Sequence, residues 1–483
     1  MSGYTKCEVI EVIVFDYSIV SALLLLLSFF MLSLAYFAWR SARRIFAIPL
    51  VVDLIFFFVF VKIGLYYLLP TLMRIGSNYQ FEREVGVAIF DLVFVYMIEF
   101  VSWLMWAAGL IIIFRIFKKD SKTITTSEFL SQRKSKSIVL LALFSLGFIA
   151  FQISSLLGAK PGGLLEVFKS LFFYAGLASG PFLMVVSLRY YGKTLFFLGT
   201  ITTVFSLVSL STRGALVYVV LFCLFLTWYI LRDRKSKYIV LSLFATLAVS
   251  YFVFGGLISG AVYIDDSGHI SLDVGVSSDK KGSRSTLEEI EWRFGASTRM
   301  GTAFINLYNR GEAAGFNPIK HSLMGFLPRS LNPDKPIPST LDGHDIYSQG
   351  MYIISREIYG YGTYNMVEFP TGGHFYWEFG FSGVLFLSTI SGMYIGLCAY
   401  FFSKLGIVVI PLMIAVFKPW GYVDPKIWVS DIALQIYQII LPLILLIFII
   451  HFIQCVRYIF PKKPNPGYVR AGQPRETGTL TVY

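Results

Sequence analysis

The chain has 483 residues, of which 56% are hydrophobic and 14% are charged, and its formal net charge is +12. Soluble proteins carry roughly a quarter of charged residues, so the composition excludes an ordinary soluble protein and predicts an all-α polytopic membrane protein. The positive charge does not indicate a nucleic-acid partner, because most of it stands in short clusters beside apolar runs. The four scattered cysteines form neither a disulfide framework nor a metal-binding pattern, and we expect no metal and no cofactor.

Apolar runs follow one another along most of the chain. A transmembrane helix needs about 20 predominantly apolar residues to cross the ~30 Å hydrocarbon core of a bilayer. By this measure we expect about eleven transmembrane helices, of which the tenth is the shortest. The expected spans cover 17–39, 47–69, 86–114, 138–158, 166–188, 194–210, 214–231, 238–264, 374–402, 405–418 and 431–454.

Basic residues follow every second expected span, from the first to the eleventh. The clusters contain Arg40, Arg43 and Arg44; Lys118, Lys119, Lys122, Arg133, Lys134 and Lys136; Arg189 and Lys193; Arg232, Arg234, Lys235 and Lys237; Lys404; and Arg457, Lys462 and Lys463. Because positively charged loops stay in the cytoplasm, all six clusters predict the same orientation. The turn at 211–214 and the long polar segment 265–373 are then extracytoplasmic.

This orientation divides the chain into four parts. A bundle of about eight spans covers 1–264, a large extracytoplasmic loop covers 265–373, about three spans cover 374–455, and a disordered cytoplasmic tail covers 456–483. Inside the loop we expect a helix at 286–310, because Thr286 is a suitable N-cap and apolar residues recur at helical spacing. Prolines exclude regular structure from 325–345, and a second helix or turn is expected at 345–358.

Four cations in or beside the loop are candidates for anion binding. Arg213 begins a span among small residues that let a headgroup approach, and Arg293 lies in the expected loop helix. Arg329 and Lys335 stand in a stretch whose prolines fix the direction of these side chains. Guanidinium groups bind phosphate oxygens in pairs and stay charged. The alternatives are a membrane-interface anchor for Arg213 and ion pairs with neighbouring carboxylates for the others.

Three side chains are candidates for a general base: His344, His374 and Glu378. His374 stands at the very start of the ninth expected span, and Glu378 falls several residues into its apolar run, where an ionisable group is costly. A histidine or carboxylate beside a phosphate site can take a proton from a hydroxyl group. The alternative is that each is an ordinary hydrogen-bonding group.

Three further carboxylates, Asp53, Asp91 and Glu99, fall inside earlier spans. Burial within a bilayer makes them suspects for function as well. The structural alternative is that they pair with one another or with Lys62.

Three short motifs resemble the O-antigen polymerase (Wzy) family of oligosaccharide repeat-unit polymerases. They are Ser211-Thr212-Arg213-Gly214, then Leu327-Pro328-Arg329 with Pro333-Asp334-Lys335-Pro336, and Gly373 to Gly383 with Phe379-Gly380-Phe381-Ser382-Gly383. These motifs are similar to the family's Ser-Arg-Gly element, its Pro-Arg and Lys-Pro loop, and its glycine-containing entry into a span. The order also matches, over roughly 205–395. One departure is His374, where relatives often carry an acidic residue; the next acid here is Glu378.

The resemblance implies a bacterial inner-membrane glycosyltransferase that is metal-independent and GT-C-like, with its large loop in the periplasm. Its partners would be the lipid bilayer, glycans linked to undecaprenyl pyrophosphate, and a chain-length regulator protein. A growing glycan would move en bloc onto the non-reducing end of an incoming lipid-linked repeat unit. We expect Arg213, Arg293, Arg329 and Lys335 to hold the pyrophosphate. His374, Glu378 or His344 would then serve as the base or orient the acceptor.

Two other functions remain open at this point. An O-antigen ligase would pass the glycan to a lipid A core and would differ only in its acceptor. A transporter or flippase of lipid-linked sugars would place polar residues along a path through its spans and would often contain internal repeats. The concentration of charge in one outer loop favours an enzyme.

Overall fold

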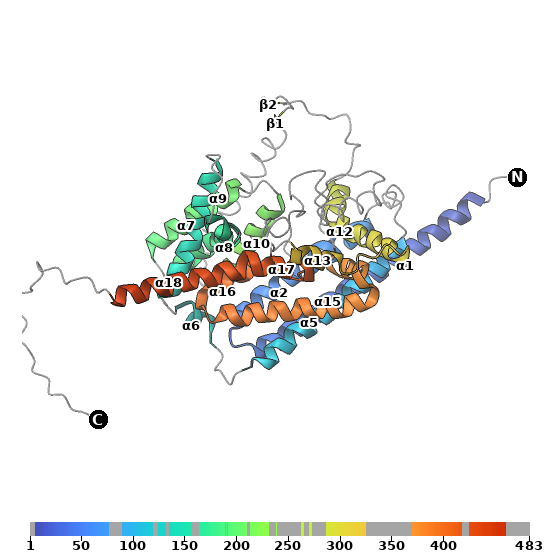
Figure 1. The fold of residues 1–483 in the computed structure, drawn as a ribbon. Coiled ribbons are helices and arrows are strands. Elements are labelled where there is room, and N and C mark those ends of the chain that lie inside the picture. The colour runs from blue at the N-terminus through green and yellow to red at the C-terminus, as the bar shows by residue number, and fades with distance from the viewer. Residues whose placement is uncertain are drawn as a thin grey trace, which may run out of the picture.

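The structure is a computed structural model, and it is built almost entirely of helices (Figure 1). It describes residues 5–76, 89–118, 124–131, 135–156, 164–188, 190, 192–209, 213–230, 238, 262–264, 270–272, 286–324, 370–417 and 425–459. The first helices are α1 (Thr5–Ile45), α2 (Pro49–Ile63), η1 (Gly64–Leu68), α3 (Leu69–Gly76), α5 (Ile89–Ile116), α6 (Thr126–Ser131), α7 (Ser135–Leu156), α8 (Leu164–Ser187), α9 (Lys193–Ser209) and α10 (Arg213–Ile230). They are followed by α12 (Thr286–Asn309), α13 (Asn317–Met324), α15 (Thr371–Ser403), η2 (Gly406–Val408), α16 (Val409–Val416), α17 (Val429–Gln435), η3 (Ile436–Ile440) and α18 (Leu441–Ile459).

A short hairpin departs from the all-α class expected. β1 (Val262–Ile264) pairs antiparallel with β2 (Ile270–Leu272), and Val262 lies opposite Leu272. Short apolar runs with β-branched residues favour strands, and the residues between them include aspartate and glycine, which favour turns. β1 occupies the end of the eighth expected span, so the prediction of helix up to residue 264 is wrong there.

Helices α5 and α15 form a closely packed pair that runs in parallel. Gly392 of α15 lies against the backbone carbonyl of Trp106, where a Cβ atom would clash. Further along both helices, the ring of Phe117 stacks on that of Tyr400 with centroids 4.3 Å apart. Small residues allow such close approach of backbones, which is how transmembrane helices commonly associate.

The basic residues of several clusters gather at one end of the long helices. Phe46 after α1 stacks on Phe114 of α5, and the Ser137 hydroxyl of α7 donates to the Leu405 carbonyl that follows α15, at 2.8 Å. Lys136 Nζ lies 3.2 Å from Nε2 of His451 in α18. The basic end is defined by Arg43, Arg44, Lys118, Lys136 and Lys404, which lie at these helix termini.

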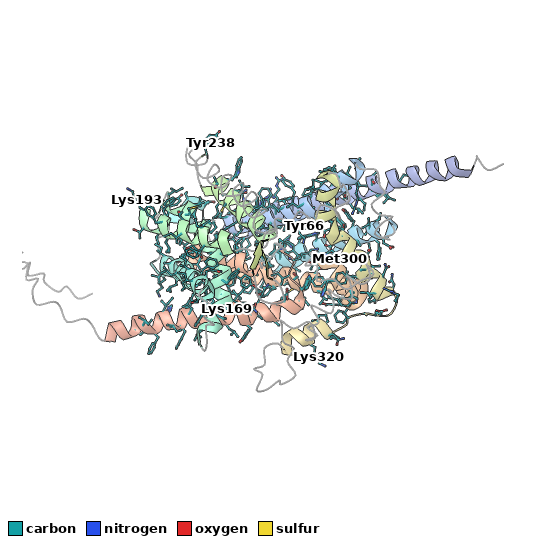
Figure 2. The ribbon with its side chains drawn as sticks, turned by 90° about the horizontal axis from the view of Figure 1, so that it is seen from above. Tyr66, Lys169, Lys193, Tyr238, Met300 and Lys320 are labelled. Carbon is teal, nitrogen blue, oxygen red and sulfur yellow. The ribbon has the colours of Figure 1, made fainter. Side chains whose placement is uncertain are left out.

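Helices α12 and α13 lie at the opposite end, named the α12 end. Figure 1 shows α1, α5, α15 and α18 crossing the view with α12 and α13 at one end and α6 at the other. Figure 2 views the molecule from above. In it, Met300 and Lys320 lie far from Lys193 along the direction of the long helices. Tyr229, near the end of α10, lies close to Asp53 and Arg43 at the basic end. The direction of α10 therefore places its first residue, Arg213, toward the α12 end.

Within the described residues, seven helical segments are long and apolar enough to cross a membrane. They are Ile19–Ile45, Pro49–Ile75, Asp91–Ile116, Lys136–Ser154, Phe168–Ser187, Thr371–Ser403 and Asp431–Ile453. Large apolar side chains such as Phe37, Phe386 and Phe448 are more than 60% exposed on these helices, which suits contact with lipid rather than water. The chain is a polytopic membrane protein, as its composition predicts.

The other four expected spans have different outcomes. The runs 194–210 and 405–418 contain the shorter apolar helices Lys193–Ser206 and Gly406–Val416. Helix α10 covers nearly all of 214–231, and most of 238–264 lies outside the described residues. The total of about eleven therefore stays a prediction.

Helix α12 confirms the helix expected at 286–310. It packs against η1, α3, α5 and α15 and buries Met300, Phe304 and Leu307 together with Trp377 of α15. Helix α15 begins at Thr371, and the expected end of the outer loop at 373 stays a prediction. The segments 325–345 and 345–358 and the tail 460–483 lie outside the described residues.

Candidate functional site

Helix α15 is longer than a membrane span requires, and it is kinked near its start. Phe379 (φ −140°, ψ 23°) and Gly380 (φ 63°, ψ −148°) leave the helical conformation. The dihedrals of Gly380 strongly favour glycine, and a Cβ there would lie 2.5 Å from the Tyr308 hydroxyl of α12. The part after the kink, 381–403, can cross the ~30 Å hydrocarbon core by itself. The part before it is a separate short helix that folds back beside 381–388, since a Cβ on Gly383 would lie 2.2 Å from the Phe375 carbonyl oxygen.

Three hydrogen bonds hold the loop after α12 on this kink. The backbone N–H of Ala314 donates to the Trp377 carbonyl and that of Gly315 to the Glu378 carbonyl, both at 3.1 Å. The indole Nε1 of Trp377 donates to the Glu312 carbonyl at 2.7 Å. Buried backbone groups require such partners, so α12 and the start of α15 form one unit.

His374 and Glu378 meet on one face of the short helix before the kink. They are four residues apart, which places side chains on neighbouring turns, and Nδ1 of His374 lies 3.1 Å from Oε1 of Glu378. His374 is 5% exposed and Glu378 is 1% exposed. His374 Nδ1 and both carboxylate oxygens of Glu378 have no hydrogen-bond partner among the described residues, so the two side chains are within ion-pair distance without the alignment of a hydrogen bond. A buried carboxylate is costly without a partner, so His374 offsets part of the cost of burying Glu378.

Three aromatic rings enclose the imidazole of His374. Trp428 stacks on it with a centroid distance of 4.3 Å and an interplanar angle of 2°. Phe304 of α12 and Trp377 of α15 meet it edge-on at 5.5 and 5.9 Å. These rings limit the orientation of the imidazole and exclude water from it, which strengthens its interaction with Glu378.

Glu99 of α5 fixes the start of α15. Its Oε1 accepts hydrogen bonds from the backbone N–H groups of Gly372 at 2.5 Å and Gly373 at 3.1 Å. Its Oε2 forms an ion pair with Nζ of Lys426. The first amides of a helix have no partner within it, and the positive end of the helix dipole favours an anion. Glu99 thus caps the helix that carries His374.

Lys426 contacts α5 at two further residues. Its Nζ donates to the Ser102 hydroxyl at 3.2 Å and lies 4.2 Å from the ring centroid of Trp103. The side chains of both Glu99 and Lys426 are fully buried. A cation–π contact and two polar contacts together compensate for removing the ammonium group from water.

The segment 425–428, which contains Lys426, also presents Trp428 to the site. Trp106 Nε1 donates to the Pro425 carbonyl at 3.1 Å. The backbone N–H of Ile427 donates to the Ser391 hydroxyl at 2.8 Å. The segment is therefore held across both α5 and α15, and Trp428 follows directly where α17 begins.

The predicted site residues fall into three groups. His374 and Glu378, expected as alternative bases, form one pair. Arg213 is the first residue of α10 and Arg293 lies in α12, but their side chains are outside the description. His344, Arg329 and Lys335 lie outside the described residues altogether.

The carboxylates inside the spans have partners that the sequence does not suggest. Glu99 pairs with Lys426, while Asp53 lies 3.3 Å from Nε of Arg43 and accepts a hydrogen bond from Trp39 Nε1 at 2.8 Å. The idea that these two carboxylates pair with each other or with Lys62 is wrong. Arg43 is closer to Asp53 because α1 and α2 are joined by a tight turn at the basic end.

Sequence reasoning missed Lys426 and Trp428. Their position in the sequence could have indicated them, because both lie in the short gap 419–430 between the tenth and eleventh expected spans. The predicted topology places this gap on the same side as the large loop. Lys426 in this gap runs against the usual bias of basic residues toward the cytoplasm, which indicates a specific role for its charge.

The site offers an imidazole held between aromatic rings beside a carboxylate, and an imidazole with a neighbouring carboxylate is a combination that general-base catalysis uses. No group of three or more histidine, cysteine, aspartate or glutamate side chains in the described ranges is placed to hold a metal ion. Comparison with known proteins finds no matching family model, curated protein or solved structure.

Proposed function

We propose that the protein is a bacterial inner-membrane polymerase of lipid-linked oligosaccharide repeat units. It transfers a growing glycan from undecaprenyl pyrophosphate to the non-reducing end of an incoming lipid-linked repeat unit. The observation that carries the proposal is the His374–Glu378 pair, buried at the α12 end of a spanning helix and away from the basic end. The motif resemblance at 211–214, 327–336 and 373–383 supports the same reaction class.

The orientation of the site in this proposal follows from charge. The basic end faces the cytoplasm by the positive-inside rule, so the α12 end and the His374–Glu378 pair face the periplasm. Substrates anchored in the bilayer by a polyprenyl chain carry their pyrophosphate at the membrane surface. The short helix before the kink folds back beside the part after it, because a Cβ on Gly383 would meet the Phe375 carbonyl, and Gly372 and Ser388 both lie against Ser102 of α5. The His374–Glu378 pair therefore lies between the turn at Gly380 and the level of Ser102, in the part of the bundle nearest the α12 end.

The proposed reaction uses His374 as the base. The acceptor hydroxyl gives its proton to Nε2 as its oxygen attacks the anomeric carbon of the donor glycan. The bond from that carbon to the pyrophosphate oxygen breaks, and undecaprenyl pyrophosphate leaves with the bonding electrons. Nδ1 lies 3.1 Å from Glu378, whose carboxylate would stabilise the imidazolium that forms.

The leaving pyrophosphate gains negative charge in the transition state, and cations would stabilise it. Arg213, Arg293, Arg329 and Lys335 are the proposed clamp. Helix α10 begins toward the α12 end and α12 lies at that end, which supports a role for Arg213 and Arg293. His344 remains a candidate for orienting the acceptor.

Electrophoresis of surface polysaccharide from a deletion strain tests the proposal. Wild-type protein should restore a ladder of polymer lengths, and a His374→Ala variant at equal membrane level should leave a single repeat unit on lipid A core. His451→Ala, which changes an exposed histidine at the basic end, is the matched control and should restore the ladder. A deletion that accumulates polymer on undecaprenyl pyrophosphate indicates a ligase, and one that stops lipid-linked glycan from reaching the periplasm indicates a transporter.

A further inference from the structure

The Glu99–Lys426 ion pair connects the two chain segments that meet at His374. Glu99 holds the first amides of α15, the helix that carries His374 and Glu378. Lys426 belongs to the segment 425–428, which carries Trp428. The two partners of the ion pair come from positions 327 residues apart in the sequence.

Burial removes both charges of this ion pair from water, which costs solvation free energy. The side chains of both partners are fully inaccessible, and a buried pair of this kind is often no more stabilising than apolar residues of similar volume. The Glu99 carboxylate uses both oxygens, and Lys426 has Ser102 and Trp103 as additional neighbours. Such a fully satisfied polar cluster specifies one arrangement of the segments it joins.

We infer that Glu99 and Lys426 are positioning residues, whose ion pair sets the register between α15 and the segment 425–428 and thereby keeps Trp428 stacked on His374. A parallel stack at 4.3 Å and 2° depends on the relative placement of two backbones, not only on two side chains.

Other hydrogen bonds to this segment act at different places. The Trp106 indole donates to the Pro425 carbonyl, and the Ile427 N–H donates to the Ser391 hydroxyl. A longer hydrogen bond of 3.5 Å runs from the Thr371 hydroxyl to the Lys426 carbonyl. The ion pair connects the segment, through the Glu99 carboxylate, to the amides directly before His374. Among these contacts to the segment 425–428, the Glu99–Lys426 ion pair is the one between charged side chains that are fully buried. Its loss should therefore disturb the placement of this segment against α15 most.

The test measures how fast diethyl pyrocarbonate modifies His374 in the purified full-length protein, with peptide mass spectrometry to resolve each histidine. Trp428→Ala should raise the His374 rate by removing its cover. The double variant should raise it by a factor of roughly ten, and Glu99→Gln and Lys426→Met by at least as much, since all three break the same connection and each single variant also leaves one buried charge unpaired. The double variant leaves no unpaired buried charge, and the amide introduced by Glu99→Gln keeps an oxygen to accept from Gly372 and Gly373.

Internal references separate positioning from general destabilisation. His451 is exposed at the opposite end, and its rate should not change in any variant. Ser137→Ala, which removes a hydrogen bond at the basic end of α15, should leave the His374 rate at the wild-type value. In a double-mutant cycle, a double effect no larger than either single effect indicates one shared connection.

Three results would overturn the inference: a double variant with the wild-type His374 rate, single effects that multiply in the double variant, or no change with Trp428→Ala. The role of the positioned imidazole in glycosyl transfer rests on the proposed function. The rate at which diethyl pyrocarbonate modifies His374 does not depend on that function. If His374→Ala retains full polymer synthesis while the rates behave as expected, the proposed function fails and the positioning inference stands.

Discussion

His374 lies flat against Trp428, with the two ring planes within 2° of each other, although the residues belong to different segments of the chain. His374 is near the start of α15, and Trp428 immediately precedes α17. A flat stack covers one whole face of the imidazole, while Phe304 and Trp377 meet the same ring edge-on. Nδ1 of the imidazole faces Glu378. The opposite nitrogen is the one that the proposed mechanism uses.

Replacement of the imidazole is expected to abolish most of the activity. His374→Ala removes the proposed base, and general-base catalysis contributes typically about 10²–10⁴-fold to a rate. Glu378→Gln keeps the volume but loses the charge that stabilises the imidazolium, so its rate should fall between wild type and His374→Ala. Initial rates of repeat-unit polymerisation in membranes, corrected for protein level, measure both. Full activity of His374→Ala would remove His374 from the mechanism.

The kink of α15 is expected to depend on Gly380. Alanine at its dihedrals costs about 1–3 kcal/mol, and the new Cβ would displace the Tyr308 side chain. Gly380→Ala should therefore lower both polymer synthesis and the temperature of thermal unfolding. Gly311→Ala is the matched control, because Gly311 also has a positive φ of 81° but has open space around it. Equal activity losses in the two variants would show that the kink has no special role.

Close packing of α5 and α15 is expected to tolerate no side chain at Gly392. Gly392→Ala forces a Cβ into the Trp106 carbonyl, and such overpacking typically costs about 1–3 kcal/mol. Gly64→Ala is a suitable comparison, because Gly64 has helical dihedrals and open space, so it should be neutral or stabilising by up to about 1 kcal/mol. Thermal unfolding in detergent compares the two. A Gly392→Ala variant as stable as Gly64→Ala would contradict the packing described here.

The sequence predicts the spans and the loop helix better than it predicts the site. Apolar runs and positive clusters are properties of continuous segments, so α1, α5, α7, α8, α15 and α12 lie close to where the sequence places them. The spacing of His374 and Glu378 also follows from helical geometry. In contrast, Glu99–Lys426 and His374–Trp428 join segments far apart in the chain. No local pattern specifies such contacts, and they follow only from the packing of α5 against α15.

Loss of the proposed clamp should affect catalysis more than insertion into the membrane. Arg213→Ala and Arg329→Ala each remove a guanidinium group that would stabilise the leaving pyrophosphate, and loss of such a group typically costs about 10²–10³-fold in rate. Lys193→Ala removes an exposed cation at the start of α9 and should be neutral. Polymer ladders at matched protein level provide the comparison. Normal ladders from both arginine variants would contradict the clamp.

The orientation can be measured by cysteine labelling in spheroplasts. Lys320→Cys and Lys193→Cys, each in a background without native cysteines, place one thiol near each end of the molecule (Figure 2). A membrane-impermeant maleimide should label the Lys320→Cys protein in intact spheroplasts and the Lys193→Cys protein only after permeabilisation. The reverse pattern would place the site in the cytoplasm and exclude the proposed periplasmic reaction.

Reconstitution tests the central proposal most directly. The purified protein in lipid nanodiscs would receive only undecaprenyl-pyrophosphate-linked repeat units, and mass spectrometry would measure product length and released undecaprenyl pyrophosphate. We expect products of two or more repeat units from the wild type and from His451→Ala, with one undecaprenyl pyrophosphate released per linkage formed. We expect no such products from His374→Ala. Folded wild-type protein that leaves every repeat unit single, or His374→Ala protein that polymerises at the wild-type rate, would contradict the proposal.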